Sequence, residues 1–214
     1  MALGMAAGTA TGTAAGSYSA PASSSYELRF DSGRICLDLL ATTHPEERLD
    51  AVEPLRAWIS GSGLVPAGTA LGAADASWLV GFRELRGHVG QLVRGEPSRD
   101  SRRFGIALAR VNELACAAPT PAPRAVWDDG GSLVRALDGD PSCAALLAAV
   151  ARDAVELLTD PVARASIREC EGDNCPIVYL DTSRGRRRRW CSSETCGNRE
   201  RVARHRRRAA LARA

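Results

Sequence analysis

The sequence contains no lysine, and all 28 of its basic residues are arginine. Together with the many alanines and glycines, this points to the codon bias of a GC-rich genome. The choice of arginine over lysine at any one position therefore carries no functional information. Aromatic residues are also scarce, at 5% of the 214 residues, whereas 45% hydrophobic and 25% charged residues are ordinary proportions for a globular protein.

Long apolar runs are missing as well. None approaches the roughly 18 to 20 consecutive apolar residues of a membrane helix. Residues 1–25 are a low-complexity mixture of Ala, Gly, Thr and Ser without the basic start and apolar stretch of a secretory signal. We therefore expect a disordered tail, a cytoplasmic protein without membrane contact, and seven cysteines that do not form disulfides.

Recognisable catalytic motifs are lacking too. The three histidines, His44, His88 and His205, are far apart, and the sequence has no phosphate-binding loop, dinucleotide fingerprint or nucleophile elbow. We predict that the protein is not an enzyme. A site assembled by tertiary contacts in the first part of the chain stays open as an alternative.

Hydrophobic periodicity predicts a mainly α fold with short β-strands, of the α+β class. The clearest helix spans 75–94, where apolar residues recur every three or four positions. Further helices are expected at 35–43, 52–59, 101–116, 140–158 and 198–211. A strand at 26–30 is predicted, and residues 124–127 and 132–137 should form a hairpin around Asp128-Asp-Gly-Gly131. We expect a helical domain at 26–165 and a small module at 166–214.

Four cysteines identify that module as a zinc site. Cys170 and Cys175 form one C-x4-C pair, and Cys191 and Cys196 form another, with fifteen residues between the pairs. Two close pairs at such a separation are typical of one structural Zn²⁺ held by four thiolates. Disulfides or unrelated buried cysteines are the alternatives. Knuckle, β-hairpin and helix would follow in order, a treble-clef-like arrangement that so small a core could not stabilise without the metal.

These residues resemble the CGNR zinc-finger family. The similarity rests on the cysteine pairs, on Tyr179-Leu-Asp181-Thr-Ser183, on Arg189-Trp190-Cys191-Ser192 and on Cys196-Gly197-Asn198-Arg199. Residues 37–42 resemble the early Leu-Asp-Leu motif of the ABATE domain, although Ala41 replaces a common Asn. The resemblance implies a bacterial, stress-induced transcription regulator whose finger binds DNA and whose helical domain senses a signal.

Charge is concentrated in the module. Residues 168–214 contain thirteen arginines and six acidic residues, a net charge of +7, against −4 for the other 167 residues. The residues predicted to contact nucleic acid are Arg184, Arg186, Arg187, Arg188, Arg189, Arg199, Arg201, Arg204 and Arg208. Compensation of the zinc thiolates, solvation, or contact with a protein partner are the alternatives for these arginines.

Four further residues are expected to support the finger. Tyr179 lies on its predicted strand, and Asp181 should accept hydrogen bonds in the hairpin or near the metal. Trp190 is expected to fill the small core rather than to stack on bases. Asn198 is predicted to cap the last helix, with adenine recognition as the alternative.

The sequence thus predicts a zinc-dependent, DNA-binding transcription regulator. RNA binding and a protein-interaction adaptor that uses the same finger are the alternatives. The helical domain is expected to bind a small-molecule signal or to form a homodimer. The target site, the signal and the sign of regulation do not follow from the sequence.

Overall fold

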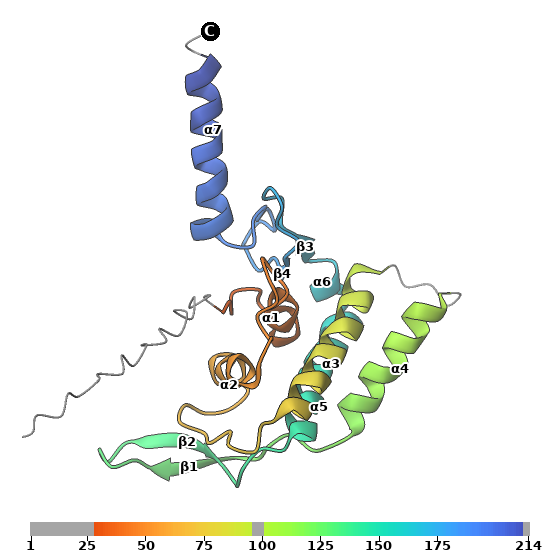
Figure 1. Cartoon of the computed structure of the whole chain (residues 1–214), viewed down its shortest axis with the longest axis vertical. Coiled ribbons are helices and arrows are strands. Elements are labelled where there is room, and N and C mark those ends of the chain that lie inside the picture. Colours follow the sequence, from red (N-terminus) through yellow and green to blue (C-terminus); the bar gives the residue numbers. More distant parts are fainter. Residues whose placement is uncertain (1–27, 96–100, 212–214) are drawn as a thin grey trace, which may run out of the picture.

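The structure, a computed structural model, describes residues 28–95 and 101–211. A helical body carries a zinc-finger region at one end, and two elements project from this assembly: a β-hairpin and the last helix (Figure 1). The arrangement confirms the α+β class, a helical first part followed by a small finger. The predicted tail at 1–25 lies outside the described residues.

Three long helices form the centre of the body: α3 (Ala76–Arg94), α4 (Arg102–Cys116) and α5 (Cys143–Thr159). Each begins at a residue whose side chain accepts backbone N–H groups of the first turn, namely Asp75, Ser101 and Ser142. Ser142 explains why α5 starts at Cys143 and not at the predicted position 140. The apolar stripe predicted for 75–94 is buried in the core, as expected for an amphipathic helix.

Two shorter helices, α1 (Ile35–Ala41) and α2 (Val52–Gly61), complete the body. On α2, Trp58 is fully buried and meets Phe82 edge to face, with ring centroids 5.8 Å apart. Just before α1, Arg34 pairs with Asp153 at 2.8 Å and with Glu156 at 2.9 Å on α5. These contacts fix α1 at the position on which the finger rests.

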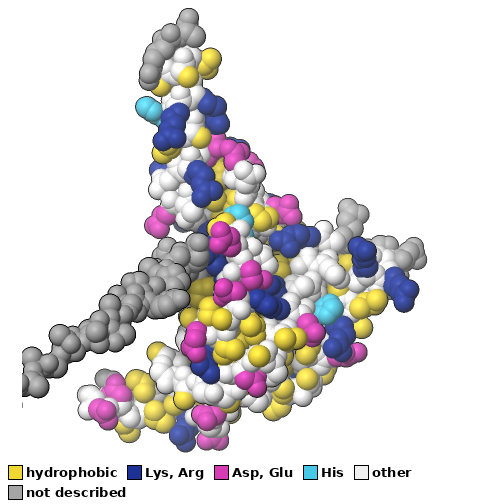
Figure 2. Space-filling model, in the orientation of Figure 1, with side chains coloured by type: hydrophobic (Ala, Val, Ile, Leu, Met, Phe, Trp, Pro, Cys, Tyr) yellow, Lys and Arg dark blue, Asp and Glu magenta, His cyan; other side chains and the backbone are white. Residues whose placement is uncertain are grey.

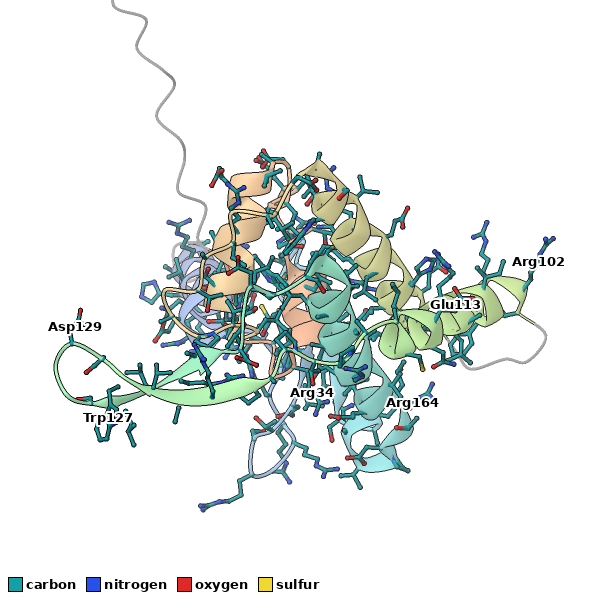
Figure 3. All side chains as sticks on the ribbon, turned by 90° about the horizontal axis from the view of Figure 1, so that it is seen from below. Arg34, Arg102, Glu113, Trp127, Asp129 and Arg164 are labelled. Atoms are coloured by element: carbon teal, nitrogen blue, oxygen red, sulfur yellow. The ribbon has the colours of Figure 1, made fainter. Side chains whose placement is uncertain are left out.

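The predicted hairpin is present. Strands β1 (Pro123–Trp127) and β2 (Leu133–Leu137) pair antiparallel, and Asp128 accepts hydrogen bonds from the backbone N–H groups of Gly130 and Ser132 in the turn. The hairpin extends away from the helices, with Trp127 and Asp129 near its end, whereas Arg102 of α4 lies on the opposite side of the molecule (Figure 3).

A short helix, α6 (Pro161–Arg164), leads into the finger, which consists of strands β3 (Ile167–Glu169) and β4 (Val178–Leu180), a π-helical turn η1 (Ser193–Gly197) and α7 (Asn198–Leu211). It is packed against the body, because Val178 joins the main core and the Leu180 N–H donates to the Ser32 carbonyl at 2.8 Å. Gly33 permits this approach: it has φ +88°, and an added Cβ would lie 3.2 Å from that of Leu180.

Three predicted elements differ from the structure. Residues 28–30 of the predicted strand 26–30 are not in a strand, and the helix predicted at 35–43 ends at Ala41. The finger hairpin was expected to run from a strand at 177–180 through a turn at Ser183-Arg184-Gly185 and back to Trp190. Instead, β4 pairs with the preceding β3, and residues 186–190 form no strand. Pairing with β3 brings Cys170 and Cys175 to the ends of adjacent strands, which the expected pairing would not do. Within the described residues, no helix is both long enough and apolar enough to span a bilayer.

Candidate metal centre and basic face

Two loops bring the four predicted cysteines together. Cys170 follows β3 and Cys175 comes shortly before β4, so the β3–β4 connection forms the first loop. Its tight bend includes Asn174 at φ 56°, a left-handed conformation that asparagine tolerates. Cys191 and Cys196 belong to the second segment, in and just before η1.

The sulfur positions fit a tetrahedral zinc ion. All four Sγ atoms lie within 4.8 Å of one another, and Cys191 Sγ is 3.7 Å from both Cys175 Sγ and Cys196 Sγ. Tetrahedral Zn–S bonds of about 2.3 Å require sulfur separations of about 3.8 Å. All four residues are buried and none is in a disulfide. The cluster therefore fits one structural Zn²⁺ held by Cys170, Cys175, Cys191 and Cys196, with no ligand position left for a reactive water.

In the metal-free site, burial controls the ionisation of the cysteine thiols. It raises the pKa of Cys175, Cys191 and Cys196 to about 11. Burial also opposes ionisation of Cys170, but the N–H groups of Cys191 and Gly172 donate to its sulfur and bring its pKa below the ordinary value. Because zinc binds the thiolate form, loading the site releases protons, which couples zinc affinity to pH.

The cysteines share a small core of their own. Ile177 and Tyr179 are buried against them, Trp190 packs at the edge, and Ala41 of α1 closes the cluster from the body. A side chain at position 172 would crowd the metal ligands, since a Cβ added to Gly172 would lie 3.2 Å from Cys196 Cβ and 3.4 Å from Cys170 Sγ. The predicted supporting positions of Tyr179 and Trp190 thus lie directly beside the metal site.

Asp181 organises the loop that follows β4. Its buried carboxylate accepts the backbone N–H groups of Ser183 and Arg188, each at 2.9 Å. Hydrogen bonding from the Ser183 side chain, and then from these two N–H groups, holds the pKa of Asp181 below its usual value. The Tyr179 hydroxyl donates to the Arg188 carbonyl at 2.5 Å. The loop is closed at its base, and Arg184, Arg186 and Arg187 are exposed at its tip.

The helix start differs from the prediction. The Ser192 hydroxyl accepts the N–H groups of Glu194 and Thr195 and therefore caps the helical segment. Asn198 lies one turn further on, where η1 passes into α7, so it does not occupy the cap position. The prediction missed the cap because it placed the first helical turn after Cys196, whereas that turn contains Cys196.

No residue of α7 is buried, and the helix extends away from the body (Figures 1 and 2). Arginines occur around its circumference, as expected for a helix without a continuous apolar face.

The predicted arginines divide into two groups. Arg188 points inward: its guanidinium lies 4.6 Å from the Tyr179 ring centroid and donates to the Trp190 and Cys191 carbonyls. Arg189 pairs with Glu171, and Arg201 donates to the Gly197 and Ser193 carbonyls. Those without a side-chain hydrogen bond or ion pair among the described residues are Arg184, Arg186, Arg187, Arg199, Arg204 and Arg208.

One contact to the metal site has no counterpart among the predictions. Arg29 Nη1 donates to Cys191 Sγ at 3.3 Å while Nη2 pairs with Asp31 at 2.8 Å. The cation lies against a cluster whose four thiolates and one zinc would carry a net charge of −2. No spacing pattern in the sequence indicates this contact, because 162 positions separate the two residues.

Comparison with known families agrees with this geometry. Residues 33–161 match the family model ABATE, described as "putative stress-induced transcription regulator", and residues 166–209 match the CGNR zinc finger. Neither description names an enzymatic activity. A search of curated proteins found no match.

Proposed function

Because the chain belongs to the ABATE family and carries a CGNR zinc finger, we propose that it is a zinc-dependent transcription regulator that binds DNA through the basic surface of the finger. One observation carries the proposal. The zinc cluster joins two exposed elements, the loop at 183–187 and α7, whose six unpaired arginines have no acceptor among the described residues.

Zinc would act here as a structural centre. With the metal bound, the four cysteines hold the β3–β4 loop against η1, and η1 continues directly into α7. The loop at 183–187 and helix α7 are thereby held on one scaffold. The guanidinium groups of both elements can therefore contact phosphates of the same duplex. Arginine also provides a planar pair of donors for guanine, which would add base specificity to the electrostatic attraction.

Fluorescence anisotropy of a labelled 25-base-pair duplex, titrated with zinc-loaded full-length protein at several salt concentrations, tests the proposal. If the six unpaired arginines each meet a phosphate, the log–log salt slope should be about −5. Replacement of Arg184, Arg186 and Arg187 by Gln should reduce the slope by roughly 2 to 3. The matched control replaces Arg102, Arg103 and Arg135, which are exposed on the helical body and the β1–β2 hairpin, by Gln.

Competition with RNA and single-stranded DNA shows which kind of nucleic acid the protein prefers. We expect duplex DNA to compete best, and a preference for RNA would replace DNA by RNA as the partner. Absence of binding at low salt by protein with one zinc per chain would overturn the proposal. A nuclease-resistant complex with a protein partner would then support the adaptor function.

The helical region is proposed to sense a small molecule. A cleft of about 780 Å³ supports this role, because it is lined both by the body and by the finger. Arg29, His44 and Arg48 contribute from the body, and Ser192, Thr195 and Arg199 from the finger. A ligand in this cleft would contact both parts at once. A metabolite panel that leaves the melting temperature of the full chain unchanged would contradict the sensing role.

A further inference from the structure

A second basic surface lies on the helical body. It is a groove of about 440 Å³ along α3, bordered by the end of α1. The lining residues are Leu40, Thr43, Arg83, Arg86, Gly87, Gly90, Gln91 and Arg94. Among these lining residues there is no carboxylate, although the chain outside 168–214 has a net charge of −4. The groove is therefore a local basic feature on an otherwise mildly acidic region.

Helical spacing creates this groove. Arg83, Gly87, Gly90 and Arg94 follow one another at four, three and four positions, so they share one stripe of α3. An added Cβ at Gly87 would meet nothing within 4 Å, and at Gly90 it would lie 3.3 Å from Arg94 Nη1. The Arg94 side chain thus folds back over Gly90, beside Leu40. Glycine weakens a helix interior, and it is useful where another group must approach the backbone closely.

The arginines differ in their partners. Arg86 is buried and pairs with Glu47, so its charge is compensated. Arg94 Nη2 donates to the Pro176 carbonyl at 3.1 Å, and its Nε lies 3.9 Å from Glu169. Arg83 has no hydrogen bond or ion pair within residues 28–95 and 101–211, and its Nε is buried. The Arg83 guanidinium lines the groove and carries further N–H donors, so an anion in the groove would supply an acceptor for them.

We propose that this groove binds phosphate between Arg83 and Arg94, and that it holds a backbone phosphate when the finger is bound to nucleic acid. The second half of this statement rests on the proposed function. The C-terminal end of α3 is directed toward the finger, and Arg94 connects the two through Pro176 (Figure 1). A polyanion that extends beyond the finger would therefore reach the groove. The side-chain amide of Gln91 can provide an additional donor.

The open space at Gly87 allows a matched test. Gly87→Glu places a carboxylate four residues after Arg83, where it supplies the missing partner and repels phosphate. Gly87→Gln adds a side chain of the same size without the charge. Both residues favour helix more than glycine does, so both variants should fold at least as stably as the wild type. Arg83→Gln removes the cation itself.

Two measurements on the zinc-loaded full chain test whether the groove binds phosphate. In the duplex titration, Gly87→Glu and Arg83→Gln should each reduce the salt slope by about 1, which corresponds to one lost phosphate contact, while Gly87→Gln changes it less. Separately, inorganic phosphate should raise the melting temperature more than chloride at equal ionic strength. That increase should disappear in Gly87→Glu and Arg83→Gln and persist in Gly87→Gln.

The outcomes separate the two proposals. Duplex binding with an unchanged slope in both variants, together with no specific effect of phosphate, would overturn the groove and leave the finger's function intact. Phosphate stabilisation of equal size in the wild type and in Gly87→Glu would also overturn it. If the duplex does not bind but phosphate stabilises only chains with an intact groove, the groove is a site for a free phosphorylated compound, and the proposed function fails.

Discussion

Arg29 donates a hydrogen bond to the sulfur of Cys191, at 3.3 Å, and so links the segment before the helical body to a ligand of the zinc site. The contact adds a positive charge beside thiolates that share a buried cluster. Groups just outside a metal's ligands orient those ligands and adjust their electron density. The contact therefore predicts that the metal affinity of the finger depends on a residue outside it.

We accordingly expect Arg29→Met to weaken zinc binding by about 10- to 100-fold, as is typical when a hydrogen bond to a metal ligand is lost. Competition with a chromophoric chelator measures the affinity. Arg135→Met, an exposed substitution on β2, is the control and should retain zinc like the wild type. Equal affinities of Arg29→Met and wild type would show that the contact does not tune the metal.

Loss of a zinc ligand should affect more than the finger. Cys196→Ser is expected to abolish stoichiometric zinc binding, and zinc contributes roughly 10 kcal/mol or more to the folding of small finger modules. Because Val178 of β4 is part of the main core, the body should also lose stability. Native mass spectrometry reports the metal content, and thermal unfolding reports the stability. Cys116→Ser, at an exposed cysteine on α4, should change neither.

Asp38 should make stability depend on pH. Burial raises its pKa to about 6, although the Ser32 N–H donates to its carboxylate at 2.9 Å. An unfolded aspartate has a pKa of about 3.9, so between pH 4 and 6 the folded state binds the extra proton and stability falls as pH rises. The penalty is complete above pH 6 and amounts to at most about 3 kcal/mol.

Asp38→Asn should remove that penalty while its amide oxygen still accepts the Ser32 N–H. The variant is expected to exceed the wild type in urea stability at pH 7.5 and to approach it near pH 4.5. Comparing variant and wild type at each pH cancels the separate effect of acid on zinc binding. A difference that stays constant between these pH values would contradict the assigned cause.

Truncation of Trp58 and truncation of Trp127 should cost very different amounts of folding free energy. Trp58 is fully buried against Phe82, and its replacement by Ala should cost about 3 to 5 kcal/mol through the cavity it leaves. Trp127 is 72% exposed at the end of β1, so Trp127→Ala should cost less than about 1 kcal/mol. Urea unfolding of both variants checks the prediction, and a large loss for Trp127→Ala would reveal a contact beyond those described.

Several features were predictable because their signals are local. The apolar spacing over 75–94 specifies α3, since one face of a helix must be buried. Asp128 and Gly131 provide the turn between β1 and β2. The paired cysteines predict the zinc ligands because each close pair needs only a short loop to converge.

Other features depend on neighbours that the sequence does not identify. Arg188 was expected to face nucleic acid together with the adjacent arginines, but its contact with Tyr179 and the nearby carbonyls turns it inward. The choice of β3 as the partner of β4, and of Ser192 as the cap, likewise depends on where the zinc loops meet the body. Identical side chains in one basic run thus acquire different roles through packing.

By itself, the sequence determined the helical character of the body, the four zinc ligands and the concentration of arginine near the end of the chain. Each of these follows from composition or from spacings shorter than about thirty residues. Only the tertiary structure decided which arginines are unpaired, that Arg29 contacts Cys191, and that Arg94 donates to the Pro176 carbonyl of the finger. Those relations depend on distances between segments remote in sequence, and such distances are set by packing of the whole core.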